Sequence, residues 1–256
     1  MIVFVAGPPR TGSMWTYNVT RALLEAAGKT ILHHDPLADE IEVAEQAVGD
    51  ANYMGLDEVY CIKAHLRISP GLPNTKVINN YRDIRDSILS VMRFMKLDDF
   101  EKALGIAKSL MADTDYYSDF AQHHGNIIRI NYNNMVADPV RAIGSINDFL
   151  ELGVGKDQWS EIADRFSRHR VQELVKNLDQ VSVSSSGEIE GDASENCTSV
   201  VNRHGGYRVL DKETLFQTNH ISSKAEGEWR EVFTPEQQER LLEITSDWLK
   251  KYGFEI

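Results

Sequence analysis

The sequence predicts a single α/β domain in which a central parallel sheet of about four or five strands is flanked by helices. Short apolar runs of strand length recur at 2–6, 59–62, 75–81 and 126–131. Segments with apolar residues at helical spacing alternate with them, and the first run leads directly into the glycine-containing loop 7–15. Strands that alternate with helices are typical of parallel sheets, because each crossover needs a long connection.

The remaining elements follow in order along the chain. The first helix carries its apolar stripe from Trp15 to Ala26 and stops at Gly28, a short strand is expected at 31–32, and the acidic segment 39–48 is predicted to be a solvated helix. Further helices are expected at 84–95, 104–123, 139–150, 158–166, 171–178 and 235–252.

The segment 182–206 differs in composition from the rest of the predicted domain 1–256. It is rich in Ser, Gly, Glu and Asn and has almost no apolar periodicity. This composition predicts a mobile loop within the domain, either passive or able to cover a substrate as a lid.

Composition and charge limit the function classes. The net charge of −12 argues against general binding to nucleic acid or to an anionic membrane, because both need an excess of basic surface. Cys61 and Cys197 have no metal-ligand spacing and cannot form a disulfide framework, which favours a reducing compartment. The longest apolar runs fall short of the roughly 20 residues of a membrane span. With the first strand beginning at Ile2, we expect a cytoplasmic protein.

The loop from Gly7 to Trp15 predicts a phosphate-binding site. A strand, a glycine-containing turn and a helix direct backbone N–H groups and a helix N-terminus toward one place. Gly7 and Gly12 have the separation found in nucleoside-triphosphate loops, but Ser13 occupies the position of the expected lysine. Arg10 is the loop's cation and can contact phosphate or sulfate through two N–H groups. We therefore expect a phosphosulfate site rather than an ATP site; the alternative is an ordinary turn.

Other polar residues fall where predicted strands end. Lys63 and His65 are two residues apart, so they share a face if the strand continues, and place a cation beside a possible base. Arg82 follows the next strand, and Ser90 lies two turns into the helix after it. Ligands of open parallel sheets bind at such carboxyl ends. The histidines and aspartate at 33–35 are expected to lie in a loop, because neighbours on a strand point to opposite faces and cannot readily share a metal ion.

Five segments of the sequence resemble the motifs of the cytosolic-type sulfotransferases, which use 3'-phosphoadenosine 5'-phosphosulfate. Residues 9–15 resemble Pro-Lys-Ser-Gly-Thr-Thr-Trp, with Arg10 in place of lysine, and residues 63–67 resemble Lys-Thr-His-Leu-Pro without the proline. Residues 82–90 match Arg-Asn-x-x-Asp-x-x-x-Ser closely. Residues 132–135 resemble the motif Tyr-Glu-Asp-Met, and residues 227–230 resemble Gly-Asp-Trp-Lys. All occur in family order and cover most of the chain.

The resemblance implies a role for each matched residue in donor binding. The loop would bind the 5' phosphosulfate, Arg82 and Ser90 would bind the 3'-phosphate, and Tyr132 would contact the adenine. The family's late Arg-Lys-Gly aligns with Ser222-Ser223-Lys224, which lacks the arginine. The complete set of expected donor-binding residues is Arg10, Thr11, Gly12, Ser13, Met14, Trp15, Arg82, Ser90, Tyr132, Ser222, Ser223 and Lys224.

The resemblance also implies the chemistry. His65 would take the proton from an acceptor hydroxyl during in-line attack on sulfur, while Lys63 and Arg10 would offset charge on the leaving phosphate oxygen, with no metal. An ordinary histidine pKa of about 6.5 suits a base near neutral pH. The expected acceptor is a small molecule with a hydroxyl group.

Two other functions stay open from the sequence. An atypical kinase with a phosphate-binding loop would use ATP and magnesium, and a nucleotide-binding module of the same fold would have lost catalysis. The family's dimer motif is retained only at Arg230, Thr234 and Glu239, with Pro235 replacing its valine, so a monomer or a weak homodimer is expected.

Overall fold

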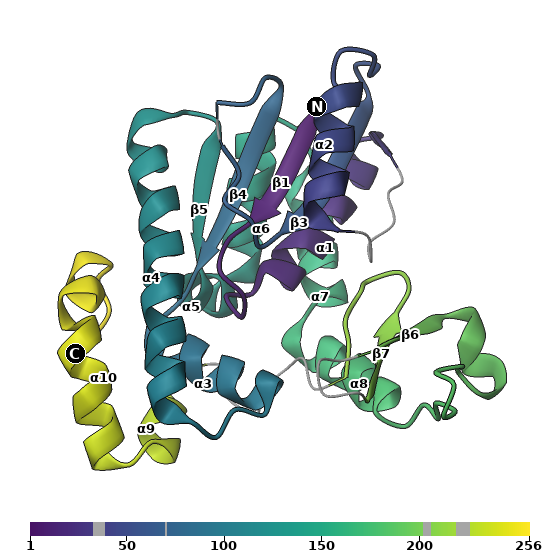
Figure 1. The fold of residues 1–256 in the computed structure, drawn as a ribbon. Coiled ribbons are helices and arrows are strands. Elements are labelled where there is room, and N and C mark those ends of the chain that lie inside the picture. Colours follow the sequence, from purple (N-terminus) through teal and green to yellow (C-terminus); the bar gives the residue numbers. More distant parts are fainter. Residues whose placement is uncertain (33–38, 70, 202–205, 219–225) are drawn as a thin grey trace. The chain divides into compact units, whose positions relative to one another are not determined.

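The computed structural model describes residues 1–32, 39–69, 71–201, 206–218 and 226–256 (Figure 1). The chain divides into two compact units. The sheet unit comprises Met1–Ile162 and Lys224–Ile256, and the hairpin unit comprises Ala163–Ser223.

The sheet unit contains a parallel sheet of five strands in the order β2-β3-β1-β4-β5, which confirms the predicted fold. Its strands are β1 (Ile2–Ala6), β2 (Thr30–Ile31), β3 (Glu58–Ala64), β4 (Thr75–Tyr81) and β5 (Ile127–Asn131). β1 is wholly buried because both faces of the sheet are covered, as its continuous apolar sequence predicts. Ala6 pairs with Ala64 and with Asn79, so β1, β3 and β4 reach the same edge of the sheet.

Helices cover both faces of this sheet (Figure 1). α1 (Ser13–Ala26) and α6 (Pro139–Leu150) contact each other as well as the sheet. α2 (Glu40–Asp50) and α4 (Phe100–His123) cover the other face. On that face Val43 and Ala47 of α2 and Tyr117 of α4 belong to one buried cluster with strand residues, among them Ile2, Phe4, Tyr60, Ile62, Val77 and Ile127. This layering leaves the strand ends, and the loops that follow them, at one edge of the sheet.

A second buried cluster joins α3 (Ile84–Met95) to α4, α9 (Trp229–Val232) and α10 (Pro235–Lys251). α10 begins as predicted, with Pro235 in its first turn and a capping box between Thr234 and Gln237. α4 begins at Phe100 rather than at the expected position 104, because Asp99 caps it earlier. α5 (Tyr132–Ala137) also lies in the sheet unit, and α7 (Lys156–Arg165) spans the boundary between the two units.

The hairpin unit contains α8 (Arg168–Leu178), the 3-10 helix η1 (Gly191–Glu195) and the strands β6 (Cys197–Val201) and β7 (Tyr207–Asp211). β6 and β7 pair antiparallel. Residues 182–206 are predicted from their composition to be a loop, but η1 and β6 lie within this segment. β6 depends on pairing with β7 later in the chain, which local periodicity does not reveal. Mobility of this segment stays a prediction.

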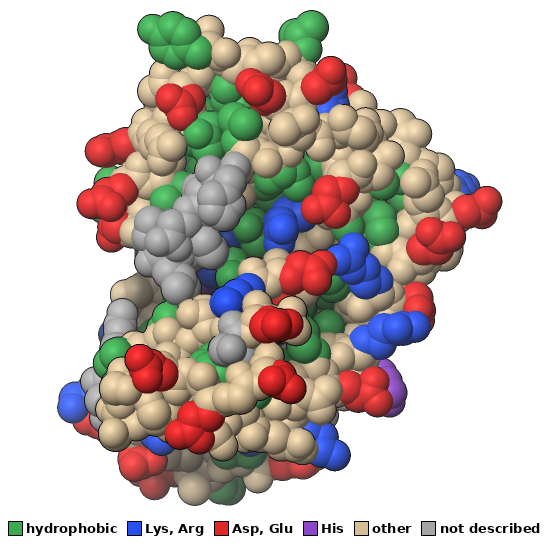
Figure 2. All heavy atoms as spheres, turned by 90° about the vertical axis from the view of Figure 1, so that its right-hand side faces the viewer, with side chains coloured by type: hydrophobic (Ala, Val, Ile, Leu, Met, Phe, Trp, Pro, Cys, Tyr) green, Lys and Arg blue, Asp and Glu red, His purple; other side chains and the backbone are tan. Residues whose placement is uncertain are grey.

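The surface reflects the acidic composition. On the face in Figure 2, Asp and Glu side chains are spread widely, with Lys and Arg side chains between them. The net charge of −12 is thus distributed over the surface rather than confined to one cluster on that face. An anionic ligand would need a local group of basic residues.

Candidate active site

The loop between β1 and α1, residues 7–12, approaches neighbouring elements at its two glycines so closely that a side chain there would clash. Gly7 has a φ of 149°, and a Cβ there would lie 2.8 Å from atoms of two asparagines of β4. Gly12 has a φ of 90° and immediately precedes α1, and a Cβ there would lie 2.8 Å from side-chain atoms of Tyr132 and Met135. The glycines therefore let the loop lie against β4 and α5 at the amino end of α1, the place where the sequence predicts phosphate binding.

Arg10 lies in the middle of this loop and contacts α3. Its φ of 68° is in the left-handed region, which is uncommon for a residue with a side chain and is often found at functional sites. Its Nε donates a hydrogen bond to Oγ of Ser90 over 2.9 Å, and its guanidinium carbon lies 4.9 Å from the centre of the Phe94 ring. Ser90 and Phe94 are one turn apart on α3, so this side of the helix faces the loop.

Arg82 directly follows β4 and joins the same group. Its Nη1 donates to the carbonyl oxygen of Arg10 over 3.4 Å, and its guanidinium lies 4.2 Å from the centre of the Tyr132 ring. Tyr132 begins α5 immediately after β5. Burial raises the pKa of Asp86, and the nearby charge of Arg82 partly offsets this effect. Residues that follow β1, β4 and β5 are thus brought together at one edge of the sheet.

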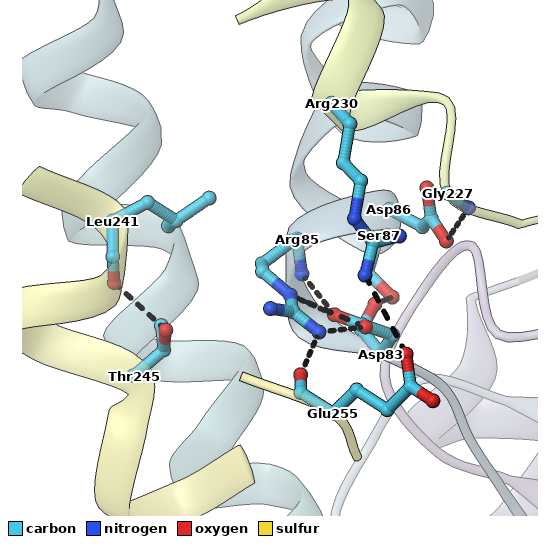
Figure 3. Close-up of polar contacts among 9 residues, drawn as sticks. All are labelled: Asp83, Arg85, Asp86, Ser87, Gly227, Arg230, Leu241, Thr245 and Glu255. Carbon is cyan, nitrogen blue, oxygen red and sulfur yellow. Dashed lines mark hydrogen bonds and ion pairs between the residues drawn. The ribbon is translucent and has the colours of Figure 1, made fainter. Parts of the chain in front are cut away.

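The first turn of α3 is held by buried polar contacts, drawn in Figure 3. Asp83 caps the helix by accepting a hydrogen bond from the backbone N of Arg85 over 2.9 Å. The Arg85 guanidinium pairs with the Asp83 carboxylate at 2.7 Å and also donates to the carbonyl oxygen of Glu255. Oδ2 of Asp86 accepts from the backbone N of Gly227 over 2.9 Å. The late segment of the chain therefore fixes the helix that follows Arg82.

Lys63 and His65 form a hydrogen-bonded pair at the end of β3. Nζ of Lys63 lies 2.8 Å from Nε2 of His65, and Nδ1 of His65 lies 3.0 Å from the carbonyl oxygen of Gly7. A carbonyl oxygen only accepts, so Nδ1 carries the hydrogen and Nε2 accepts from the lysine ammonium. The strand ends at Ala64, one residue earlier than the same-face argument assumes, yet the two side chains meet.

The surroundings lower the pKa of both partners. Burial is the main cause for Lys63, whose pKa falls to about 8; Arg10 lowers it further and the Glu40 carboxylate raises it. His65 is exposed as a residue, but loss of water around its ring lowers its pKa to about 4, and the charges of Lys63 and Arg10 add to this effect. The imidazole is therefore neutral at pH 7. Its pKa lies below the ordinary value that the sequence analysis assumes.

Glu40 is a member of this group that the sequence analysis missed. It is the first residue of α2, and its Oε2 accepts a hydrogen bond from the backbone N of His65 over 2.7 Å. The sequence places it in an acidic helix expected to be solvated, but the residue is half-buried. Acidic residues are common in the first turn of helices, so nothing in the sequence distinguishes this one.

Other predicted donor-binding residues lie in the loop 7–12 and in the first turn of α1. Thr11 and Ser13 are buried, and Oγ1 of Thr11 donates to the carbonyl oxygen of Pro8 over 2.7 Å. Met14 and Trp15 are half-buried in the first turn. Three more predicted residues, Ser222, Ser223 and Lys224, lie outside the described residues, so their place near the site stays a prediction.

Among the described residues, no three His, Cys, Asp or Glu side chains are grouped as metal ligands would be. The motif at 33–35 lies outside the part of the chain that the structure describes. No described helix is both long and apolar enough to span a lipid bilayer.

Solved structures with the same fold include nucleotide-bound complexes. One is retinol dehydratase with androsterone and the inactive cofactor PAP, which is 16% identical with a TM-score of 0.60 and covers 97% of this chain and 80% of that chain. Another is mouse sulfotransferase SULT7A1 complexed with PAP, which is 18% identical with a TM-score of 0.59. The match covers 98% of this chain and 87% of that chain. In a complex with retinol and PAP, retinol dehydratase is 17% identical with a TM-score of 0.59. The match covers 97% of this chain and 81% of that chain.

Sequence comparisons give the family. A search of curated proteins finds no match to the chain. The family model described as the sulfotransferase domain matches residues 2–253, which include the loop 7–12, the Lys63–His65 pair and the start of α3. The chain therefore belongs to the sulfotransferase domain family.

Proposed function

We propose that this protein transfers the sulfuryl group of 3'-phosphoadenosine 5'-phosphosulfate to a hydroxyl group of a small molecule. The observation that carries the proposal is the convergence of Arg10, Arg82, Ser90 and the Lys63–His65 pair at the carboxyl ends of β1, β3 and β4. This edge includes the point where the strand order reverses around β1, the usual ligand-binding position in open parallel sheets.

The residues present suit an adenosine donor with anionic groups at both its 3' and its 5' position. Backbone N–H groups of the loop and the Arg10 guanidinium would bind the 5' phosphosulfate. Arg82 and Ser90 would hold the 3'-phosphate, and Tyr132 and Trp15 would contact the adenine. The hydrogen bonds from Arg10 to Ser90 and from Arg82 to the loop support the proposal, because they place two cations and a hydroxyl within one local site.

In the proposed reaction the acceptor oxygen attacks sulfur in line. The new oxygen–sulfur bond forms as the bond from sulfur to the phosphate oxygen breaks, and adenosine 3',5'-bisphosphate leaves with the electron pair. Nε2 of His65 takes the hydroxyl proton and later releases it to water. Arg10 and Lys63 stabilise charge on the leaving phosphate oxygen.

The Lys63–His65 contact adds a constraint to this scheme. In the structure the lone pair of Nε2 accepts a hydrogen bond from Lys63, so it is not available to a hydroxyl proton at the same time. Lys63 must therefore turn from Nε2 toward the leaving phosphate oxygen as the acceptor hydroxyl takes its place. The same movement and the donor's negative charge would raise the pKa of His65 from about 4 and strengthen it as a base.

Titration calorimetry and a turnover assay test this proposal. The protein is titrated with adenosine 3',5'-bisphosphate and with ATP plus magnesium, and is then given the labelled donor with a panel of phenols, sterols and primary alcohols. Preference for the bisphosphate together with transfer of label supports the proposal. Preference for ATP with magnesium would favour a kinase, and bisphosphate binding without transfer to any acceptor would favour a non-catalytic module. A cytoplasmic location and a monomeric or weakly dimeric state also stay predictions.

A further inference from the structure

The backbone of His65 is held by a side chain from a different part of the chain. β3 ends at Ala64, and the sheet ladder no longer supplies a partner for the next N–H group. The Glu40 carboxylate accepts this hydrogen bond at 2.7 Å. The imidazole is fixed from its other side, since Nδ1 donates to the carbonyl oxygen of Gly7. Glu40 and Gly7 therefore set the position of His65 together.

We propose that Glu40 is a positioning residue of the transfer reaction, one that fixes the backbone of His65 and provides a negative charge that stabilises the ammonium of Lys63. The inference rests on the proposed function for its effect on turnover. Its structural part, the link between Glu40 and the Lys63–His65 pair, is measurable without any substrate.

The charges around Lys63 explain why a carboxylate matters there. Arg10 from the loop after β1 acts against the ammonium, and burial removes the water that would otherwise stabilise it. The neutral ring of His65 accepts its hydrogen bond but adds no negative charge. On the side of α4, the phenol of Tyr117 is uncharged because burial raises its pKa, and the charges of Asp113 and Glu40 add to that effect. Glu40 is the carboxylate whose charge raises the pKa of Lys63 back toward its ordinary value.

Two substitutions separate the hydrogen bond from the charge. Glu40→Gln keeps an oxygen that can accept from the His65 N–H but removes the negative charge, whereas Glu40→Ala removes both. Glu45→Gln is the matched control, because Glu45 is an exposed carboxylate on the same helix with no described contact to the pair. Thermal unfolding of all three variants shows whether a loss of activity reflects a loss of folded protein.

The first measurement is the pKa of Lys63, obtained without substrate by NMR titration of its ¹³C-labelled ε-carbon, with Lys63→Arg identifying the signal. We expect a midpoint near 8 in the unchanged protein. Glu40→Gln and Glu40→Ala should lower it by about 0.5 to 1 pH unit, and Glu45→Gln should leave it unchanged. An unchanged midpoint in the Glu40 variants would overturn the electrostatic part of the inference.

The second measurement is kcat as a function of pH with the phosphosulfate donor and the best acceptor. Glu40→Gln should move the alkaline loss of kcat to lower pH and keep most of the activity below it. Glu40→Ala should in addition reduce kcat about tenfold or more at every pH, because the base is no longer held in place. Equal kcat profiles for Glu40→Ala and Glu45→Gln would overturn the positioning role. If the Lys63 midpoint moves but the unchanged protein transfers no label, the proposed function fails and the structural inference stands.

Discussion

Removing the negative charge of Asp83, which pairs with the buried guanidinium of Arg85, should destabilise the sheet unit strongly. The side chains of Arg85 and Asp83 are 1% and 9% exposed, and they pair at 2.7 Å (Figure 3). Asp83→Asn retains an oxygen that can cap α3 but leaves the arginine charge buried without its carboxylate. Breaking one side of a buried pair costs about 3 to 5 kcal/mol. The carbonyl of Glu255 and the ring of Trp229, 4.3 Å away, still stabilise the cation, so we expect a loss of about 2 to 4 kcal/mol.

Urea unfolding followed by tryptophan fluorescence measures this loss selectively, because all four tryptophans lie in the sheet unit. A loss of this size should lower the unfolding midpoint by about 1 M. Asp99→Asn is the matched control, since Asp99 caps α4 through the backbone N of Lys102 and its ion pair with that residue is exposed. The control should leave the midpoint nearly unchanged. Equal midpoints for the two variants would refute the reasoning, since burial would then make no difference.

Four other outcomes follow from the site. His65→Ala should abolish transfer, while calorimetry should show that adenosine 3',5'-bisphosphate still binds. An active variant would remove this base from the mechanism. Arg82→Gln should weaken binding of the bisphosphate about tenfold or more relative to adenosine 5'-phosphate, and equal losses would contradict its 3'-phosphate role. Transfer should need neutral His65 and charged Lys63, so kcat/KM for the donor, which reports the pKa values of the free protein, should fall below about 4 and above about 8; an alkaline limb near the ordinary lysine pKa would contradict the structure. Gly12→Ala should reduce bisphosphate affinity, because its Cβ would meet Tyr132 at 2.8 Å with φ at 90°, and unchanged affinity would show that the loop adapts.

Much of the site was predictable because its residues follow strands that are recognisable one at a time. Parallel strands whose ends align bring such residues to one edge of the sheet regardless of their separation in sequence. The register of Ala6 with Ala64 and Asn79 supplies this alignment. The glycine-containing loop after β1 and the pairing of Lys63 with His65 could therefore be expected before the structure was known.

The sequence by itself thus determined the parallel sheet, the glycine loop and the family to which the chain belongs, because these depend on local periodicity and short motifs. Only the tertiary structure decided which groups act on them: the carboxylate of Glu40 on His65, the carbonyl of Glu255 on Arg85 and the strand β7 on β6. The reason is physical. A hydrogen bond or a charge acts over a few ångströms in space. When its two partners are far apart in the chain, no local sequence pattern shows that they are in contact.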